Sequence, residues 1–165
     1  MLFRSVTDVL PLEHYWVELS EDGLLSRTEG DKCNRLGGEK APWSLVRTNS
    51  HQTIFLVTTE GRSAAIASLS IPIQNGKDSA APAHKIAPLH ANDILQSIFT
   101  VPIESKDLPE RFVITISRHG MIKRSAVADL PGVSASDFVL TKINQNDELF
   151  QVLISDGAQH VLLTT

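Results

Sequence analysis

The sequence predicts an all-β protein assembled from repeated hairpins. β-branched Val, Ile and Thr are abundant, while aromatic residues make up only 5 % of the chain, a composition that favours strands. A pattern of an alternating apolar run, a turn centred on glycine and a second run recurs four times. No segment keeps a helical apolar stripe over three turns.

The four expected hairpins share one turn chemistry, because each turn glycine follows Asp, Glu or His. Asp-Gly and related pairs are strong hairpin signals, since both positions accept a positive φ at little cost. The flanking runs alternate apolar and polar residues, which predicts strands buried on one face. The expected hairpins span residues 15–27, 54–66, 112–124 and 149–163.

The turn glycines are separated by 38, 59 and 37 residues. Repeats of this size are typical of propeller-like blades, and the unequal spacing indicates insertions in the connecting loops. The segment 91–100 fits a short helix and a strand equally well. We therefore predict a single all-β domain over residues 1–165, with loops at 30–42, 74–88, 105–110 and 130–136.

Composition narrows the possible functions. The formal net charge is −4 and the isoelectric point is near 5.8, so any nucleic-acid binding has to rest on a local basic face. Cys33 is the single cysteine, which fits a reducing cytoplasm. No apolar run reaches the ~20 residues of a membrane span, and the N-terminal residues do not form a signal-peptide pattern.

Motifs for catalysis are missing from the sequence. It has no nucleophile elbow and no phosphate-binding loop. Its six histidines are scattered without the spacing of a zinc site, and Cys33 has no partner cysteine. We therefore expect no catalytic residue, no metal and no cofactor. Tyr15, Trp16 and Trp43 are expected to pack in the core or at blade seams.

Three stretches carry a resemblance to a known family. Residues 112–124, FVITISRHGMIKR, run in order through an apolar strand, a polar glycine turn and a basic Ile-Lys-Arg end. This resembles the blade hairpin in the C-terminal repeats of the A subunits of bacterial gyrase and topoisomerase IV. Residues 139–163 and 44–72 are similar to other parts of those repeats, so that the resemblance covers roughly residues 13–165.

The resemblance implies a fold and a function. The fold is a β-pinwheel, a ring of four-stranded blades that exchange strands with their neighbours, and this chain has residues for about three blades. The function is sequence-independent binding and bending of duplex DNA beside the catalytic core of a type IIA topoisomerase, whose DNA-cleaving tyrosine lies in a separate domain. Three blades leave two open sheet edges, so a homodimeric ring or an exchanged strand is expected.

One signature of the family is degenerate here. The gyrase box of the family is Gln-Arg-Arg-Gly-Gly-Arg-Gly, and the matching stretch is Asn34, Arg35, Leu36, Gly37, Gly38, Glu39 and Lys40. The glycine pair and one arginine are kept, while Leu36 and Glu39 stand where the family has arginines. The resemblance therefore implies weaker binding of the topoisomerase IV type rather than chiral wrapping.

Basic residues at strand ends and turns are the candidate phosphate contacts. The best candidates are Arg118, Lys123 and Arg124, which flank one turn and are expected to form one patch. The further candidates are Arg27, Arg35, Lys40, Arg47 and Arg62. The alternative is that these are solvated charges that keep sheet edges soluble.

Two other functions remain open at this level. One is a propeller-like protein-interaction module that keeps the fold and has lost DNA binding, as the acidic net charge and the degenerate box suggest. The other is a small enzyme on a β scaffold, for which the sequence offers no paired nucleophile and base. Fold alone does not choose between them, because one fold hosts many functions.

Overall fold

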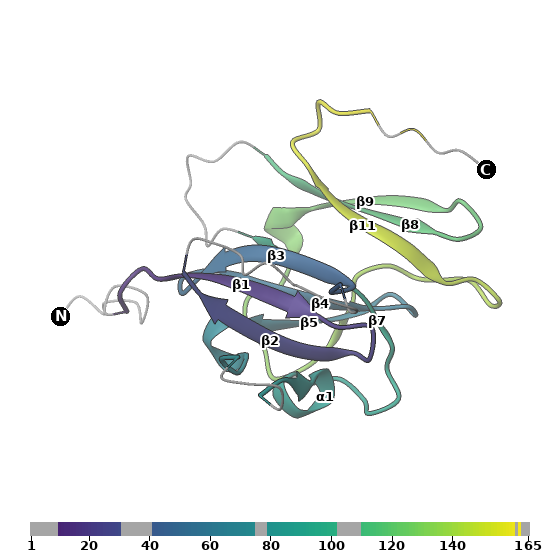
Figure 1. Cartoon of the computed structure of the whole chain (residues 1–165). Helices are drawn as coiled ribbons and strands as arrows, with labels where there is room; N and C mark the ends of the chain where they lie inside the picture. Colours follow the sequence, from purple (N-terminus) through teal and green to yellow (C-terminus); the bar gives the residue numbers. More distant parts are fainter. Residues whose placement is uncertain (1–9, 31–40, 75–78, 102–109, 161, 163–165) are drawn as a thin grey trace.

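The computed structural model describes residues 10–30, 41–74, 79–101, 110–160 and 162. Cys33 and the whole degenerate box, including Arg35 and Lys40, lie outside these residues. Regular structure in the described part is almost entirely strand (Figure 1). The short exceptions are two 3-10 turns, Ser68–Ser70 and Val127–Asp129, and the one-turn helix α1, Ala83–Ile86. None of the described helices is long and apolar enough to cross a membrane.

The strands form three antiparallel sheets. The first sheet has the order β3-β1-β2-β6, with β1 His14–Leu19, β2 Leu24–Glu29, β3 Ser44–Asn49 and β6 Ala81–Pro82. The second has the order β10-β5-β4-β7, with β4 Thr53–Thr58, β5 Arg62–Ala67, β7 Leu95–Val101 and β10 Phe138–Val139. The third has the order β11-β8-β9, with β8 Phe112–Ser117, β9 Ile122–Ala126 and β11 Leu149–Ser155.

Strand exchange links successive sheets. The hairpin β4–β5 belongs to the second sheet, yet the chain that follows it contributes β6 to the first sheet. In the same way, the chain after the hairpin β8–β9 contributes β10 to the second sheet. This arrangement confirms the predicted pinwheel-like array of blades. Among the described residues, no such strand pairs with β9, which therefore lies at the edge of the third sheet.

The prediction of a fourth hairpin over residues 149–163 is wrong. Strand β11 pairs with β8, with Leu153 opposite Ile114, and residues 156–160 contain no strand. The segment 149–155 is thus the last strand of the third sheet and not the first strand of a new hairpin. The ambiguous segment 91–100 resolves as a strand, because its second half forms β7 against β4.

The core lies in two layers between the sheets. Val17 and Leu19 of the first sheet pack against Ile54 and Leu56 of the second. The alternate residues of β4 point the other way, so Phe55 packs toward the third sheet and stacks on Phe99 with ring centroids 4.9 Å apart. Each fully buried aliphatic side chain contributes about 1.5–3 kcal/mol. The second sheet is therefore covered on both faces.

Candidate nucleic-acid interface

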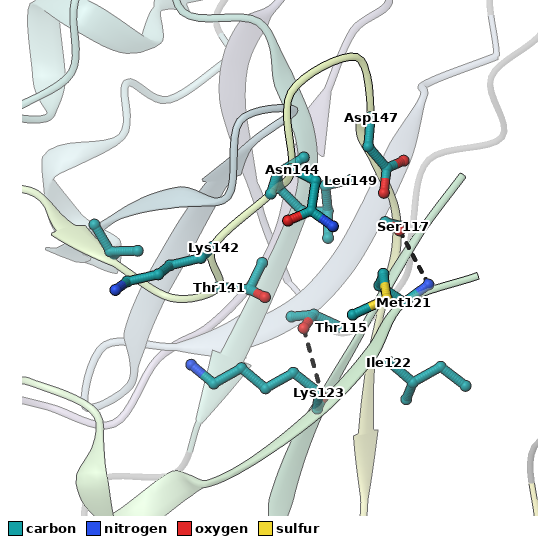
Figure 2. Close-up of a pocket in the computed structure, with 12 residues that line it drawn as sticks. Thr115, Ser117, Met121, Ile122, Lys123, Thr141, Lys142, Asn144, Asp147 and Leu149 are labelled. Atoms are coloured by element: carbon teal, nitrogen blue, oxygen red, sulfur yellow. Dashed lines mark hydrogen bonds between the residues drawn. The ribbon is translucent and has the colours of Figure 1, made fainter. Parts of the chain in front are cut away.

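A groove of about 380 Å³ lies along the hairpin β8–β9, on the side that faces the second sheet (Figure 2). Its far wall is the chain that follows β10. Polar side chains on both walls include Thr115 and Lys123 from the hairpin and Thr141, Lys142 and Asn144 from the far wall. The groove therefore combines residues about 25 positions apart in the sequence, which the strand exchange brings together.

Residues 138–143, which we call the strap, hold the far wall in place. The backbone N–H groups of Leu140 and Thr141 donate to the carbonyl oxygen of Gly61 at 3.0 and 3.2 Å. A Cβ atom on Gly61 would lie 2.2 Å from the carbonyl oxygen of Thr141, so that only glycine allows the strap to pass this close. The turn of the second sheet thus fixes the position of Lys142.

Two lysines line the groove. The Nζ of Lys123 donates to the carbonyl oxygen of Leu140 in the strap at 2.7 Å, and its side chain is exposed. Lys142 is exposed as well, and Figure 2 shows both side chains reaching to the same side of the groove. Two accessible ammonium groups on one groove form a site that attracts phosphate.

Lys142 is a groove residue that the sequence pattern did not indicate. The predicted candidates are basic residues at strand ends and turns, whereas Lys142 lies in the strap between two repeats. The signal that could have found it is a basic residue in the segment that follows each hairpin, where the exchanged strand occurs.

Arg118 lies at the tip of the same hairpin. Its Nε is 3.1 Å from Oε2 of Glu148, and the guanidinium lies 5.7 Å from the ring centre of Phe150. Both charged side chains are more than half exposed, at 58 % and 59 %. An ion pair this exposed contributes only about 0–1 kcal/mol, so Arg118 can exchange the carboxylate for a phosphate at small cost.

Arg124 lies on the opposite face from Lys123. Adjacent residues of a strand point to opposite faces, and the guanidinium of Arg124 lies 4.6 Å from the ring centre of Phe112. The expectation that Arg118, Lys123 and Arg124 form one patch is therefore wrong. Arg118 and Lys123 belong to the turn and the groove, whereas Arg124 faces away from both.

Arg27 and Arg62 are held by contacts within the fold. Arg27 is only 8 % exposed, and its Nε donates to the carbonyl oxygen of Ile71 at 2.7 Å. Arg62 lies among three carboxylates: it is paired with Asp93, 3.5 Å from Asp137 and 3.8 Å from Glu60. Arg47 is exposed on β3, opposite Trp16 in the register.

A buried carboxylate anchors the turn beside the groove. Asp147 is 1 % exposed at its side chain, and its Oδ1 accepts the backbone N–H groups of His119 at 3.1 Å and Glu148 at 2.8 Å. Burial works against the charged form, but the Ser117 hydroxyl and these two N–H groups stabilise it more strongly, so the pKa of Asp147 lies below its usual range. Asp147 thus holds the tip of the hairpin against β11.

Metal binding finds no support in the described part of the chain. Within it, no three His, Cys, Asp or Glu side chains are grouped in a way that could hold a metal ion.

Comparison with curated proteins shows sequence similarity to A subunits of DNA gyrase. The DNA gyrase A subunit of Streptococcus pneumoniae serotype 4 is 21 % identical over 170 residues, which cover 96 % of this chain and 20 % of that protein. The DNA gyrase A subunit of Staphylococcus aureus strain MRSA252 is 21 % identical over 171 residues, with 96 % and 19 % covered. The chain thus spans about a fifth of the length of these relatives. No protein-family model matches it.

Solved structures share the fold. The C-terminal domain of E. coli ParC aligns with a TM-score of 0.69 and 18 % identity, over 86 % of this chain and 56 % of that one. The C-terminal domain of a DNA topoisomerase IV aligns at 0.68 and 16 %, over 90 % and 47 %. The C-terminal domain of a DNA gyrase A aligns at 0.57 and 20 %, over 87 % and 48 %. The chain is thus similar in sequence to the A subunits of bacterial DNA gyrases and has the β-pinwheel fold of the C-terminal domains of topoisomerase IV and gyrase.

Proposed function

We propose that this chain is a non-catalytic accessory domain that binds duplex DNA without sequence preference, in the cytoplasm, beside the catalytic core of a type IIA topoisomerase. The observation that carries the proposal is the joint similarity, in sequence over 96 % of the chain to the A subunit of DNA gyrase and in fold to the C-terminal domains of such enzymes. The DNA-cleaving chemistry belongs to the core, and this chain supplies binding.

The groove offers a surface suited to this function. Lys123, Lys142 and Arg118 place three accessible cations at the third sheet. Contacts from such side chains to phosphates position a duplex without reading its sequence. Near the groove, Asp147 is buried under the turn, Asp137 lies 3.5 Å from Arg62, and the exposed Glu148 is paired with Arg118.

The test is a fluorescence anisotropy titration of the chain with a labelled duplex longer than ~100 base pairs, at ~25 and ~150 mM salt. Affinity should fall steeply with salt, by a slope of about 0.9 in log K per log salt for each phosphate neutralised. A wild-type chain that does not bind at ~25 mM salt overturns the proposal and leaves the protein-interaction module as the better interpretation.

Matched lysine variants locate the contact. Lys142→Ala should weaken binding and lower the salt slope by about one phosphate contact. Lys85→Ala removes the same charge from an exposed site on α1, at the opposite end of the molecule in Figure 1, and should leave the slope unchanged. Equal effects of the two variants would show that binding follows net charge and not the groove.

A further inference from the structure

The two junctions between neighbouring sheets are built in the same way. At each one, a hairpin packs against the preceding sheet and against the exchanged strand of that sheet. Pro82 of β6 pairs with the residue directly after the turn glycine of the first sheet, and Val139 of β10 pairs with the residue directly after that of the second. The residues that line the two junctions can therefore be compared position by position.

The junction between the first and second sheets is packed with apolar side chains. Leu56 stands five residues before the turn glycine Gly61, and Ala64 stands three residues after it. Both have no exposed surface and belong to the core that the two sheets share. Ile86 and Ala87, in the chain that follows β6, pack against the same core. Hairpin and crossing chain therefore meet here through apolar contacts.

The junction between the second and third sheets has polar residues at the same positions. Thr115 and Lys123 stand where the first junction has a leucine and an alanine, and Asn144 stands where it has a second alanine. Ile143 keeps the isoleucine. All four line the groove of about 380 Å³, a volume within the range of about 300–1,000 Å³ that is typical of small-molecule sites. The groove thus lies where polar residues replace apolar packing.

One end of the groove is suited to an anion. The Nζ of Lys123 donates one hydrogen bond to the strap, and an ammonium group has three donors, so two remain for a ligand. Lys142 is exposed beside it. The one carboxylate among the described lining residues, Asp147, lies at the opposite end in Figure 2, and its Oδ1 already accepts two backbone N–H groups. Two neighbouring ammonium groups bind a phosphate through charge-assisted hydrogen bonds.

The rest of the groove is suited to the uncharged body of a ligand. Met121, Ile143 and Leu149 give it apolar walls, and the Asn144 amide can both donate and accept a hydrogen bond. Apolar walls with a few polar groups are the usual lining of a small-molecule site. Contact with a duplex does not account for all of this lining, because Thr115 is only 3 % exposed and lies too deep to reach DNA.

We propose that the groove binds a free phosphate ester of about the size of a mononucleotide. Its phosphate lies between Lys123 and Lys142, and its body lies against Met121 and Ile143. The proposal goes beyond DNA binding, because it concerns a small ligand held between two sheets. The two lysines are also the proposed contacts to the duplex, so that such a ligand should compete with DNA.

Nuclear magnetic resonance titration of the isotope-labelled full chain tests the proposal, with adenosine monophosphate, adenosine and inorganic phosphate as probes. Adenosine monophosphate should saturate and shift the amide signals of residues 115–123 and 140–147. It should bind at least about tenfold more tightly than adenosine, which lacks the charge, and than phosphate, which lacks the apolar body. Absence of saturation overturns the proposal, and so does equal affinity for the nucleotide and for inorganic phosphate.

Variants place the ligand in the groove. Lys142→Ala should weaken binding of adenosine monophosphate about tenfold, whereas Lys85→Ala, which removes the same charge from α1, should leave it unchanged. Unchanged binding in Lys142→Ala overturns the proposal.

A double variant copies the first junction into the second. Thr115→Leu with Lys123→Ala should abolish binding of adenosine monophosphate, and circular dichroism checks that the variant folds. Lys142→Ala decides the question if it does not fold. A wild-type chain that binds the nucleotide but not the duplex overturns only the proposed DNA binding, and the reverse result overturns only the small-ligand site.

Discussion

The second and third sheets begin from the same hairpin and differ in what covers it. The turn glycines Gly61 and Gly120 have nearly the same φ, +80° and +82°. A Cβ on Gly61 would collide with the strap, whereas a Cβ on Gly120 would meet nothing within 4 Å. The comparison teaches that the role of a residue in this repeat depends on whether the next repeat lies over it, and not on the hairpin motif.

Replacing the two turn glycines, Gly61 and Gly120, by alanine should give the largest difference in stability between the covered and the uncovered turn. Gly61→Ala should lower the free energy of unfolding by about 2–5 kcal/mol, because it adds a clash with the strap to the cost of a left-handed backbone. Gly120→Ala should cost only the backbone term, about 1–2 kcal/mol. Urea unfolding measures both values, and equal losses would show that the strap does not constrain the second turn.

The next largest difference in stability is expected between two arginines that lie over aromatic rings. Arg27 lies 4.4 Å from the ring centre of Tyr15, and Arg124 lies 4.6 Å from that of Phe112. Arg27→Leu should lower the free energy of unfolding by about 2–4 kcal/mol, since it removes a buried charged hydrogen bond and a desolvated cation–π contact. Arg124→Leu removes an exposed contact and should cost less than ~1 kcal/mol. A loss at Arg124 as large as that at Arg27 would mean that its face is already covered.

The anchored turn of the third sheet should respond to pH. The pKa of Asp147 in the folded protein lies below its usual value of 3.8, so its stabilisation is present above that pH and is lost as pH falls through the folded pKa. Asp147→Asn should therefore be less stable than wild type at neutral pH, and the difference should shrink below pH 3.8. Denaturant unfolding across this range measures it, and a difference independent of pH contradicts the assignment.

The stability contributed by Glu18, on the outer face of the first sheet, should depend on pH in the opposite direction to that of Asp147 and more weakly. Burial raises the pKa of Glu18 above its usual value of 4.5, so folding favours the protonated carboxyl, and stability falls as pH rises through the folded pKa. Glu18→Gln should match wild type at acid pH and exceed its stability at neutral pH. No gain at neutral pH would argue that the charge of Glu18 is already compensated in the folded protein.

The local signals in the sequence predicted three of the four hairpin turns and the all-β class, because turn-glycine chemistry and alternation act within a few residues. They failed where pairing is long-range. The segment 149–155 has the alternation of a first hairpin strand, and only its pairing with β8 makes it the last strand of a sheet. Arg27 and Arg124 have the same local setting, and their burial differs because of a segment more than 40 residues away.

Strand exchange also bears on how such chains gain and lose repeats. Each of the first two sheets is completed by a strand from the following repeat. One sequence repeat in the gene therefore does not encode one complete sheet, because the last strand of each sheet is encoded in the next repeat. Deletion of an internal repeat leaves its neighbours with complete sheets, because the next repeat in line supplies the missing strand. Descendants can therefore differ in repeat number while the penalty of an incomplete sheet falls each time on the last repeat alone.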